Sequence, residues 1–126
     1  VGGYDSSVNT LAVFSGRGNT RNNETIKPDI VAPAVNVLST SRNGGYDTFT
    51  GTSFAAPFVS GSAALMMEWG ITNGNDPFLF GERIKAYLQR GATRDSFVQY
   101  PDIGWGYGRL CLKATMDLLN NYWKGV

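Results

Sequence analysis

The chain of 126 residues contains no histidine. It therefore lacks the imidazole side chain, the group that most often accepts and returns protons near neutral pH. A serine hydroxyl is a poor nucleophile until a base removes its proton, so serine-based catalysis by this chain needs a base from elsewhere. With no histidine and a single cysteine, a zinc site built from the usual Cys and His cluster is also excluded.

Cysteine is nearly absent as well. Cys111 is the only one, so no disulfide can form within the chain. It lies in an apolar stretch, which predicts a buried and unreactive thiol. The cysteine count therefore gives no information about the compartment in which the protein works.

An excess of charge and long hydrophobic runs are missing too. Lysine and arginine together number 11, aspartate and glutamate 10, and no basic stripe occurs, so nucleic acid is not expected as a partner. The longest apolar stretch, residues 63–67, is far too short to cross a bilayer. No membrane partner is expected either.

What is present suits a globular domain. Hydrophobic residues make up 42% of the chain and aromatic residues 13%, enough to bury a core in one domain of ordinary size. Short apolar or β-rich segments alternate with helical patterns, which favours an α/β fold. Strands or extended segments are expected at residues 1–5, 11–14, 27–33, 35–40 and 46–50, and helices at 52–69, 78–90 and 109–123.

Finer expectations concern the ends and faces of the helices. Asp76 followed by Pro77 predicts an N-cap and a first helical residue for the second helix, and Gly91 predicts its end. Buried positions are expected at Phe54, Phe58, Leu65 and Met66 in the first helix, and at Phe80, Ile84 and Leu88 in the second.

The first helix opens with the most informative stretch, Gly-Thr-Ser-Phe-Ala-Ala-Pro-Phe-Val-Ser-Gly at residues 51–61. Ser53 is expected in the first turn, where unpaired backbone N–H groups and the positive end of the helix dipole favour negative charge. Such a position suits a nucleophile whose reaction creates an oxyanion, because the donors are fixed before the charge develops. On spacing alone, a small-residue helix start with an uninvolved serine explains the stretch equally well.

The same stretch resembles the nucleophile motif of the subtilisin-like serine proteases (subtilases, peptidase S8 family), commonly Gly-Thr-Ser-Met-Ala-Ala-Pro-His-Val-Ala-Gly. It departs from that motif at Phe54, Phe58 and Ser60. The resemblance implies that Ser53 is the catalytic nucleophile, that its own backbone N–H donates to the oxyanion, and that Thr52 supports the oxyanion hole.

Further segments extend the resemblance, in the order of the family, to about Leu112. They are residues 14–18, 26–33 and 36–40, and the Gly-Trp-Gly-Tyr-Gly turn at 104–108 with the helix after it. The family usually has glycine at the position of Ala34, so a positive φ there would strain the alanine by about 1 kcal/mol or more. The implied fold is part of a three-layer α/β/α subtilisin-like sandwich with a mostly parallel sheet.

In this family the catalytic Asp, the catalytic His and the oxyanion-hole Asn precede the region that the chain resembles. Residues 1–126 are therefore expected to be the C-terminal portion of one subtilase catalytic domain, a serine endopeptidase that works through an acyl-enzyme. The chain alone is expected to be inactive. Two alternatives stay open: a catalytically silent subtilase-like module that binds peptides or has a structural role, and an unrelated small α/β domain.

Other residues do not replace the missing base. Lys27 and Lys85 are the candidates for a Ser–Lys pair, but nothing in their spacing supports one. This chemistry requires no cofactor. Subtilases often bind structural calcium, yet residues 73–76 fit a turn better than a calcium-binding loop and signal no metal site.

The expected partners are a polypeptide substrate and the missing N-terminal half of the same catalytic domain. A fragment of an α/β sandwich leaves a sheet edge and an apolar face uncovered. We therefore expect that half, or an oligomer, to cover them. The resemblance also favours an extracellular or cell-surface location.

Overall fold

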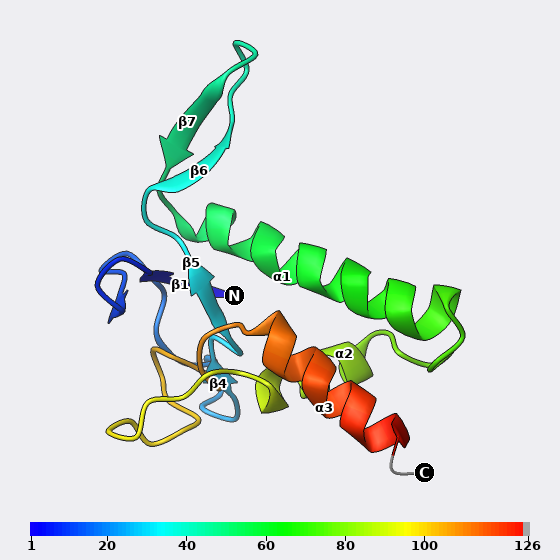
Figure 1. Cartoon of the computed structure of the whole chain (residues 1–126). Coiled ribbons are helices and arrows are strands. Elements are labelled where there is room, and N and C mark those ends of the chain that lie inside the picture. Colours follow the sequence, from blue (N-terminus) through cyan, green and yellow to red (C-terminus); the bar gives the residue numbers. More distant parts are fainter. Residues whose placement is uncertain (125–126) are drawn as a thin grey trace.

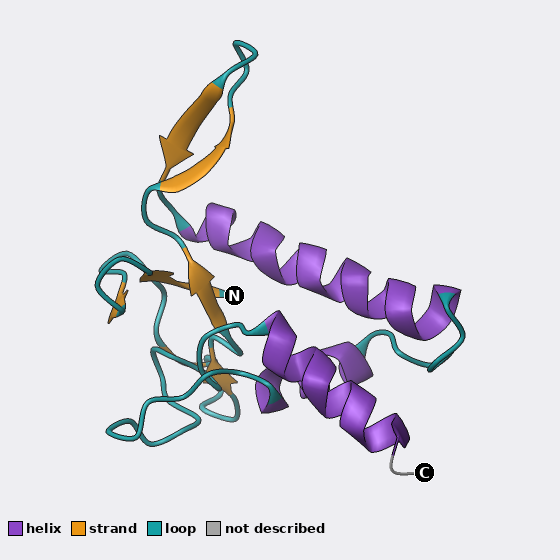
Figure 2. Cartoon of the chain, viewed as in Figure 1, coloured by secondary structure: helices purple, strands orange, loops and turns teal. Residues whose placement is uncertain are grey.

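The computed structural model describes residues 1–124. Figure 1 shows one long helix above two shorter helices, with a small sheet near the first turns of the long helix. Figure 2 shows long loops surrounding that sheet. The strands are β1 (Gly2–Asp5), β2 (Thr10–Leu11), β3 (Gly18–Asn19), β4 (Ile26–Lys27), β5 (Val31–Pro33), β6 (Val37–Thr40) and β7 (Tyr46–Phe49); the helices are α1 (Thr52–Met67), the π-helical turn η1 (Glu68–Thr72), α2 (Glu82–Arg90) and α3 (Leu112–Lys124).

The central sheet has the strand order β2-β1-β5. β1 runs parallel to β5, with Gly2 opposite Val31, and antiparallel to β2. Val31 and Ala32 of β5 have no exposed surface, as is typical of a parallel strand covered on both faces. The parallel pair confirms the α/β class that the sequence predicts.

α1 packs on this sheet through small residues. Ala55 has no exposed surface and clusters with Ala32 and Ala34. Met66, near the far end of the helix, enters the main core with Ile30, Leu79, Ile84, Leu88 and Leu119. The helical path does not stop near Gly70 as expected, because η1 continues it to Thr72.

The other side of α1 is exposed and uncharged. Leu65 and Phe58, which the sequence predicts to be buried, expose 53% and 41% of their surface, and Phe54 is half-buried. No charged side chain occurs between Thr52 and Met67. The expectation of a helix buried all round is therefore wrong for this chain, since no described segment covers that side.

β6 and β7 form a hairpin that projects from the body beyond the start of α1 (Figure 1). Its side chains are mostly exposed on both faces. Leu38 exposes 69% of its surface and Tyr46 76%. An isolated two-stranded hairpin is only marginally stable in water. Hairpins of stable domains are covered by other elements, and within residues 1–124 this one lacks such a cover.

The expected buried strand at residues 11–14 is wrong. β2 comprises only Thr10 and Leu11, and Val13 exposes 94% of its surface. The chain turns instead, because Ser15 donates its N–H to the Ala12 carbonyl (3.0 Å) and accepts the Gly3 N–H at its Oγ (3.0 Å). These contacts tie the turn to the central sheet.

The second helix begins at Glu82 rather than at residue 78. Asp76 is buried and does not cap it. Its carboxylate accepts the Phe78 N–H at 3.1 Å and an Arg83 N–H at 2.7 Å, which holds the loop before the helix. Phe80 lies in that loop and is exposed, whereas Ile84 and Leu88 are buried as expected. Gly91 ends the helix as predicted.

The last helix also begins later than expected, at Leu112. Arg109 forms bridges with Val31 and Thr93 instead of starting the helix. Cys111, expected to be buried, is half-buried. Within the described residues, no helix combines the length and the apolarity needed to cross a membrane.

Gly91, directly after α2, lies against Thr115 of α3. A Cβ atom added there would lie 2.7 Å from the Cα and 2.8 Å from the backbone N of Thr115. Thr115 is fully buried and its Oγ donates to the Cys111 carbonyl at 2.9 Å. Because the neighbour is backbone, it cannot move aside as a flexible side chain would.

We expect Gly91→Ala to lower the free energy of unfolding by about 2 kcal/mol, since the added methyl group overpacks the contact. Urea unfolding followed by circular dichroism measures the change. The matched control is Gly45→Ala in the β6–β7 turn, where an added Cβ has no neighbour within 4 Å. Equal midpoints for the two variants would contradict the close packing of α2 against α3.

Candidate active site

The two residues that the sequence singles out lie together at the start of α1. Thr52 is its first residue and Ser53 its second, and Ser53 is exposed while Thr52 is half-buried. No side chain caps this end of the helix. Among the hydrogen bonds of residues 1–124, none is donated by the backbone N–H of Thr52 or Ser53. Two donors without a partner among the described residues thus lie at the positive end of the helix dipole, an arrangement that suits an oxyanion.

Gly51 joins β7 to this helix and is held at both ends. Its N–H donates to the Ala34 carbonyl at 2.8 Å, and its own carbonyl accepts the Phe54 N–H at 3.0 Å. Its φ of 148° is one that residues with a side chain rarely adopt. Ala34 in turn donates its N–H to the carbonyl of Tyr4 in β1 at 2.9 Å, so the start of α1 is connected to the central sheet.

Ala34 does not carry the strain that a positive φ would impose, because its φ is not positive. Among the described residues other than glycine, positive φ occurs only at Asn9, Asn23 and Asn36. Asparagine tolerates this conformation better than other side chains do. The left-handed residue of the turn is therefore Asn36, and Ala34 is a fully buried contact for α1.

Two hollows flank the start of α1. The first, of about 440 Å³, is lined by Thr52 together with Val1, Gly2, Gly16, Arg17, Gly18, Asn19, Lys27 and Pro28. The second, of about 270 Å³, lies between the hairpin and α1 and is lined by Val37, Leu38, Ser39, Phe54, Pro57 and Phe58. Ser53 lines neither hollow, but it is exposed and therefore does not lie in packed core.

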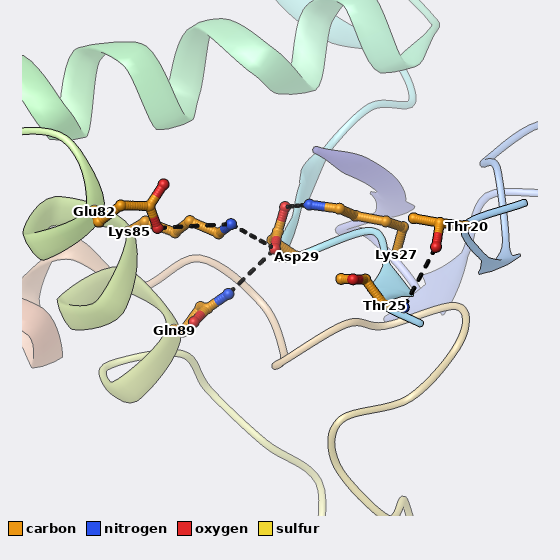
Figure 3. A network of polar contacts seen from close by, with 7 residues as sticks. All are labelled: Thr20, Thr25, Lys27, Asp29, Glu82, Lys85 and Gln89. Carbon is orange, nitrogen blue, oxygen red and sulfur yellow. Dashed lines mark hydrogen bonds and ion pairs between the residues drawn. The ribbon is translucent and has the colours of Figure 1, made fainter. Parts of the chain in front are cut away.

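The lysines weighed as substitutes for histidine are engaged elsewhere. Figure 3 shows that Lys27, Lys85 and Gln89 converge on the carboxylate of Asp29. The Lys27 Nζ lies 2.6 Å and the Lys85 Nζ 3.4 Å from its oxygens, and the Gln89 amide donates to it at 3.2 Å. The structure therefore gives no support to a Ser–Lys pair.

The Asp29 cluster joins the segment before β5 to α2. Partial burial raises the pKa of Asp29, but the hydrogen bond and positive charge of Lys27, together with Lys85, outweigh that effect and hold the pKa below its ordinary value of 3.8. The ionised carboxylate therefore stabilises the folded state. The sequence suggests only solvated loop charges here; the cluster forms because residues far apart in the chain meet.

We expect Asp29→Asn to lower the free energy of unfolding by about 1 kcal/mol at pH 7, because the lysines lose their partner. Since the folded-state pKa is depressed, the contribution is complete above pH 3.8 and is lost as pH falls through the folded-state pKa. Melting temperatures at pH 7 and at acid pH measure this, and the difference from the unmodified chain must shrink in acid.

The control for this variant is Asp117→Asn, which removes an exposed ion pair with Lys113 on α3. We expect that change to have little effect on stability, because water screens an exposed ion pair. A destabilisation by Asp29→Asn that stays constant between the two pH values would mean that the charge of Asp29 is not its cause.

An aromatic pair beside Ser53 is a feature that the sequence does not predict. The rings of Phe49 and Phe54 stack with centroids 5.1 Å apart and planes 21° apart. The sequence feature that could have indicated this stack is a phenylalanine on each side of the Gly51 turn, one of them at a departure from the subtilase motif.

No group of three or more His, Cys, Asp or Glu side chains that could hold a metal ion gathers within the described residues.

Comparison with known proteins decides the family. A model of the subtilase family matches residues 1–108 of this chain. The chain belongs to the subtilase family. Subtilases of the peptidase S8 type are a family of serine proteases, and the resemblance recognised in residues 51–61 is confirmed.

Individual subtilases resemble it over most of its length. The CspB protease of Clostridium perfringens is 55% identical in sequence, with a TM-score of 0.91 over 95% of this chain. Pyrolysin of Pyrococcus furiosus is 33% identical over 116 residues, or 86% of this chain. The serine protease AprX of Bacillus subtilis is 35% identical over 103 residues, or 71% of this chain. These neighbours agree with the expected subtilisin-like α/β architecture.

The chain spans only a minor part of these subtilases. It covers 26% of the CspB protease chain, 22% of AprX and 8% of pyrolysin.

Proposed function

We propose that Ser53 is the nucleophile of a subtilisin-type serine endopeptidase. The observation that supports this most directly is the placement of Ser53, exposed in the first turn of α1 beside unpaired N–H groups. A hydroxyl there can attack a carbonyl carbon while the same helix end stabilises the resulting oxyanion.

The proposed reaction is acyl transfer. A base accepts the proton of the Ser53 Oγ as the oxygen attacks the peptide carbonyl, and the Ser53 N–H binds the oxyanion with support from Thr52. The proton then passes to the leaving amine, which departs and leaves an acyl-enzyme. A water molecule, deprotonated by the same base, hydrolyses the ester and restores the hydroxyl.

The base must come from outside residues 1–126, which contain no histidine. We propose that these residues form the C-terminal portion of one catalytic domain and that the remainder of the same polypeptide supplies the Asp, the His and the oxyanion-hole Asn. The small share of the CspB protease that the chain covers, 26%, agrees with such a division. No cofactor is part of this proposal.

Surface area supports a covering partner. A compact protein of this mass, 13.7 kDa, exposes about 6,600 Å². The chain exposes 7862 Å², an excess of about 1,300 Å² that is more than one side of a standard interface. We assign the excess to the uncharged side of α1 and to the hairpin, and we propose the base-bearing half of the domain as their partner. Sedimentation distinguishes a complex of the chain with that half from an oligomer of the chain itself.

We also propose that the parent protein acts outside the cell or at its surface on polypeptide substrates, as the family resemblance suggests. Fractionation of the producing cells, with antibodies against the chain, tests the location. Recovery of the parent protein only from the cytoplasm would contradict it.

The experiment that decides the activity is a chimera. The matching segment of the CspB protease is replaced by residues 1–126, which is feasible because the two share 55% identity and a TM-score of 0.91. Hydrolysis of a fluorogenic peptide by this chimera supports the proposal if the activity is lost when Ser53 is replaced by alanine. A folded but inactive chimera would favour the catalytically silent alternative.

A further inference from the structure

The turn that precedes Ser53 makes a second contact with the turn between β5 and β6. Asn36 donates its backbone N–H to the Thr50 Oγ1 at 3.0 Å. Asn36 adopts a positive φ of 50°, which directs its N–H toward the end of β7. The next residue, Gly51, donates its N–H to the Ala34 carbonyl. Thr50 and Gly51 together therefore bind the β5–β6 turn at two points.

This double contact lies three residues before the nucleophile. Only Gly51 and Thr52 separate Thr50 from Ser53, and Gly51 alone would leave the link flexible. The Phe49–Phe54 stack closes the same turn from its other side, joining the last residue of β7 to α1. The orientation of the first turn of α1 is thus set by contacts that do not include Ser53 itself.

We propose that Thr50 is a positioning residue, whose side-chain oxygen holds the β5–β6 turn against the nucleophile turn and so fixes where the Ser53 Oγ points. This inference rests on the proposed function, because it concerns the reaction of Ser53. Thr50 acts through Gly51 and Thr52 and has no role in proton transfer.

The replacement Thr50→Val removes the acceptor and preserves the shape of the side chain. The Asn36 N–H lies at the surface, so water can replace the lost partner and the fold persists. The turn, however, loses one of its two restraints. A displaced nucleophile slows the chemical step without weakening substrate binding.

We expect Thr50→Val in the CspB chimera to lower kcat by about tenfold to a hundredfold with KM unchanged. Thr50→Ser, which keeps the oxygen, retains kcat. The matched control is Thr48→Val, the same change two residues earlier on β7, where the exposed side chain accepts none of the hydrogen bonds in the described part of the chain. The control retains both constants.

Titration of Ser53 with a phosphonofluoridate separates the outcomes. Slower labelling of Thr50→Val at full final occupancy supports the positioning role. An unchanged kcat, or a raised KM with unchanged kcat, overturns it and leaves the proposed function intact. If Thr50→Val does not fold, the pair Thr50→Ala and Thr50→Ser decides the same question without the extra methyl group. If the unmodified chimera is never labelled, the proposed function fails, and this inference fails with it.

Discussion

Replacing Ser53 by alanine in the CspB chimera is expected to lower kcat for peptide hydrolysis by about 10⁶-fold, a magnitude adopted from subtilisin, which is itself a member of this family. The physical reason is that Ser53 carries the exposed hydroxyl of the first turn of α1, beside unpaired N–H groups, whereas Thr52 is half-buried. Without the Ser53 hydroxyl, no acyl-enzyme forms, and only attack by water remains, assisted by substrate binding and the oxyanion hole alone.

The control for this change is Ser60→Ala. Ser60 lies on the same helix and is exposed, but its hydroxyl donates to the Ala56 carbonyl at 3.3 Å, about two turns away from the free N–H groups. This variant is expected to retain kcat and to be labelled by the phosphonofluoridate at Ser53. Comparable losses in both variants would mean that α1 tolerates no change and that the loss at Ser53 is structural. Retained hydrolysis in Ser53→Ala would exclude Ser53 as the nucleophile.

The second large effect concerns the chain by itself. We expect the purified 126-residue chain to hydrolyse no peptide above the rate of its Ser53→Ala variant. A base is missing, since the chain has no histidine and since Lys27 and Lys85 are paired with Asp29. In subtilisin, loss of the histidine alone costs about as much as loss of the serine.

A fluorogenic peptide assay over a range of pH measures this expectation. The positive control adds the separately produced remainder of the CspB protease, which is expected to restore hydrolysis by covering α1 and supplying the base. Hydrolysis by the chain alone that disappears in Ser53→Ala would show that another group acts as the base. Failure of the two parts to associate, seen by sedimentation, would count against the proposed covering half.

The sequence predicts the nucleophile turn well because its information is local. Small residues, a serine and a helix start within residues 51–61 specify the local structure, and Ser53 lies in the first turn of α1 as the stretch indicates. The same holds for the extended segments expected at residues 35–40 and 46–50, which form β6 and β7, and for Gly91, whose signals lie within a few positions of the features that they predict. The chemistry of Ser53 stays a proposal.

The failures depend on contacts of individual side chains that the local pattern does not show, or on partners outside the chain. Asp76 has the form of an N-cap, but Arg83 and the Phe78 N–H bind its carboxylate and delay the helix. Val13 has the pattern of a core residue, yet the bond from Gly3 to Ser15 turns the chain outward. The Asp29 cluster and the Thr50–Asn36 contact join segments that no local pattern connects.

The uncharged side of α1 has a consequence for protein engineering. Designers commonly exchange exposed leucine or methionine for lysine or glutamate to improve solubility. By exposure in this chain, Leu65 and Met67 qualify for such exchanges. In the proposed complete domain the same positions are interior, where an unpaired charge costs several kcal/mol. A redesign guided by this chain alone would therefore make the fragment more soluble and disable the enzyme assembled from it.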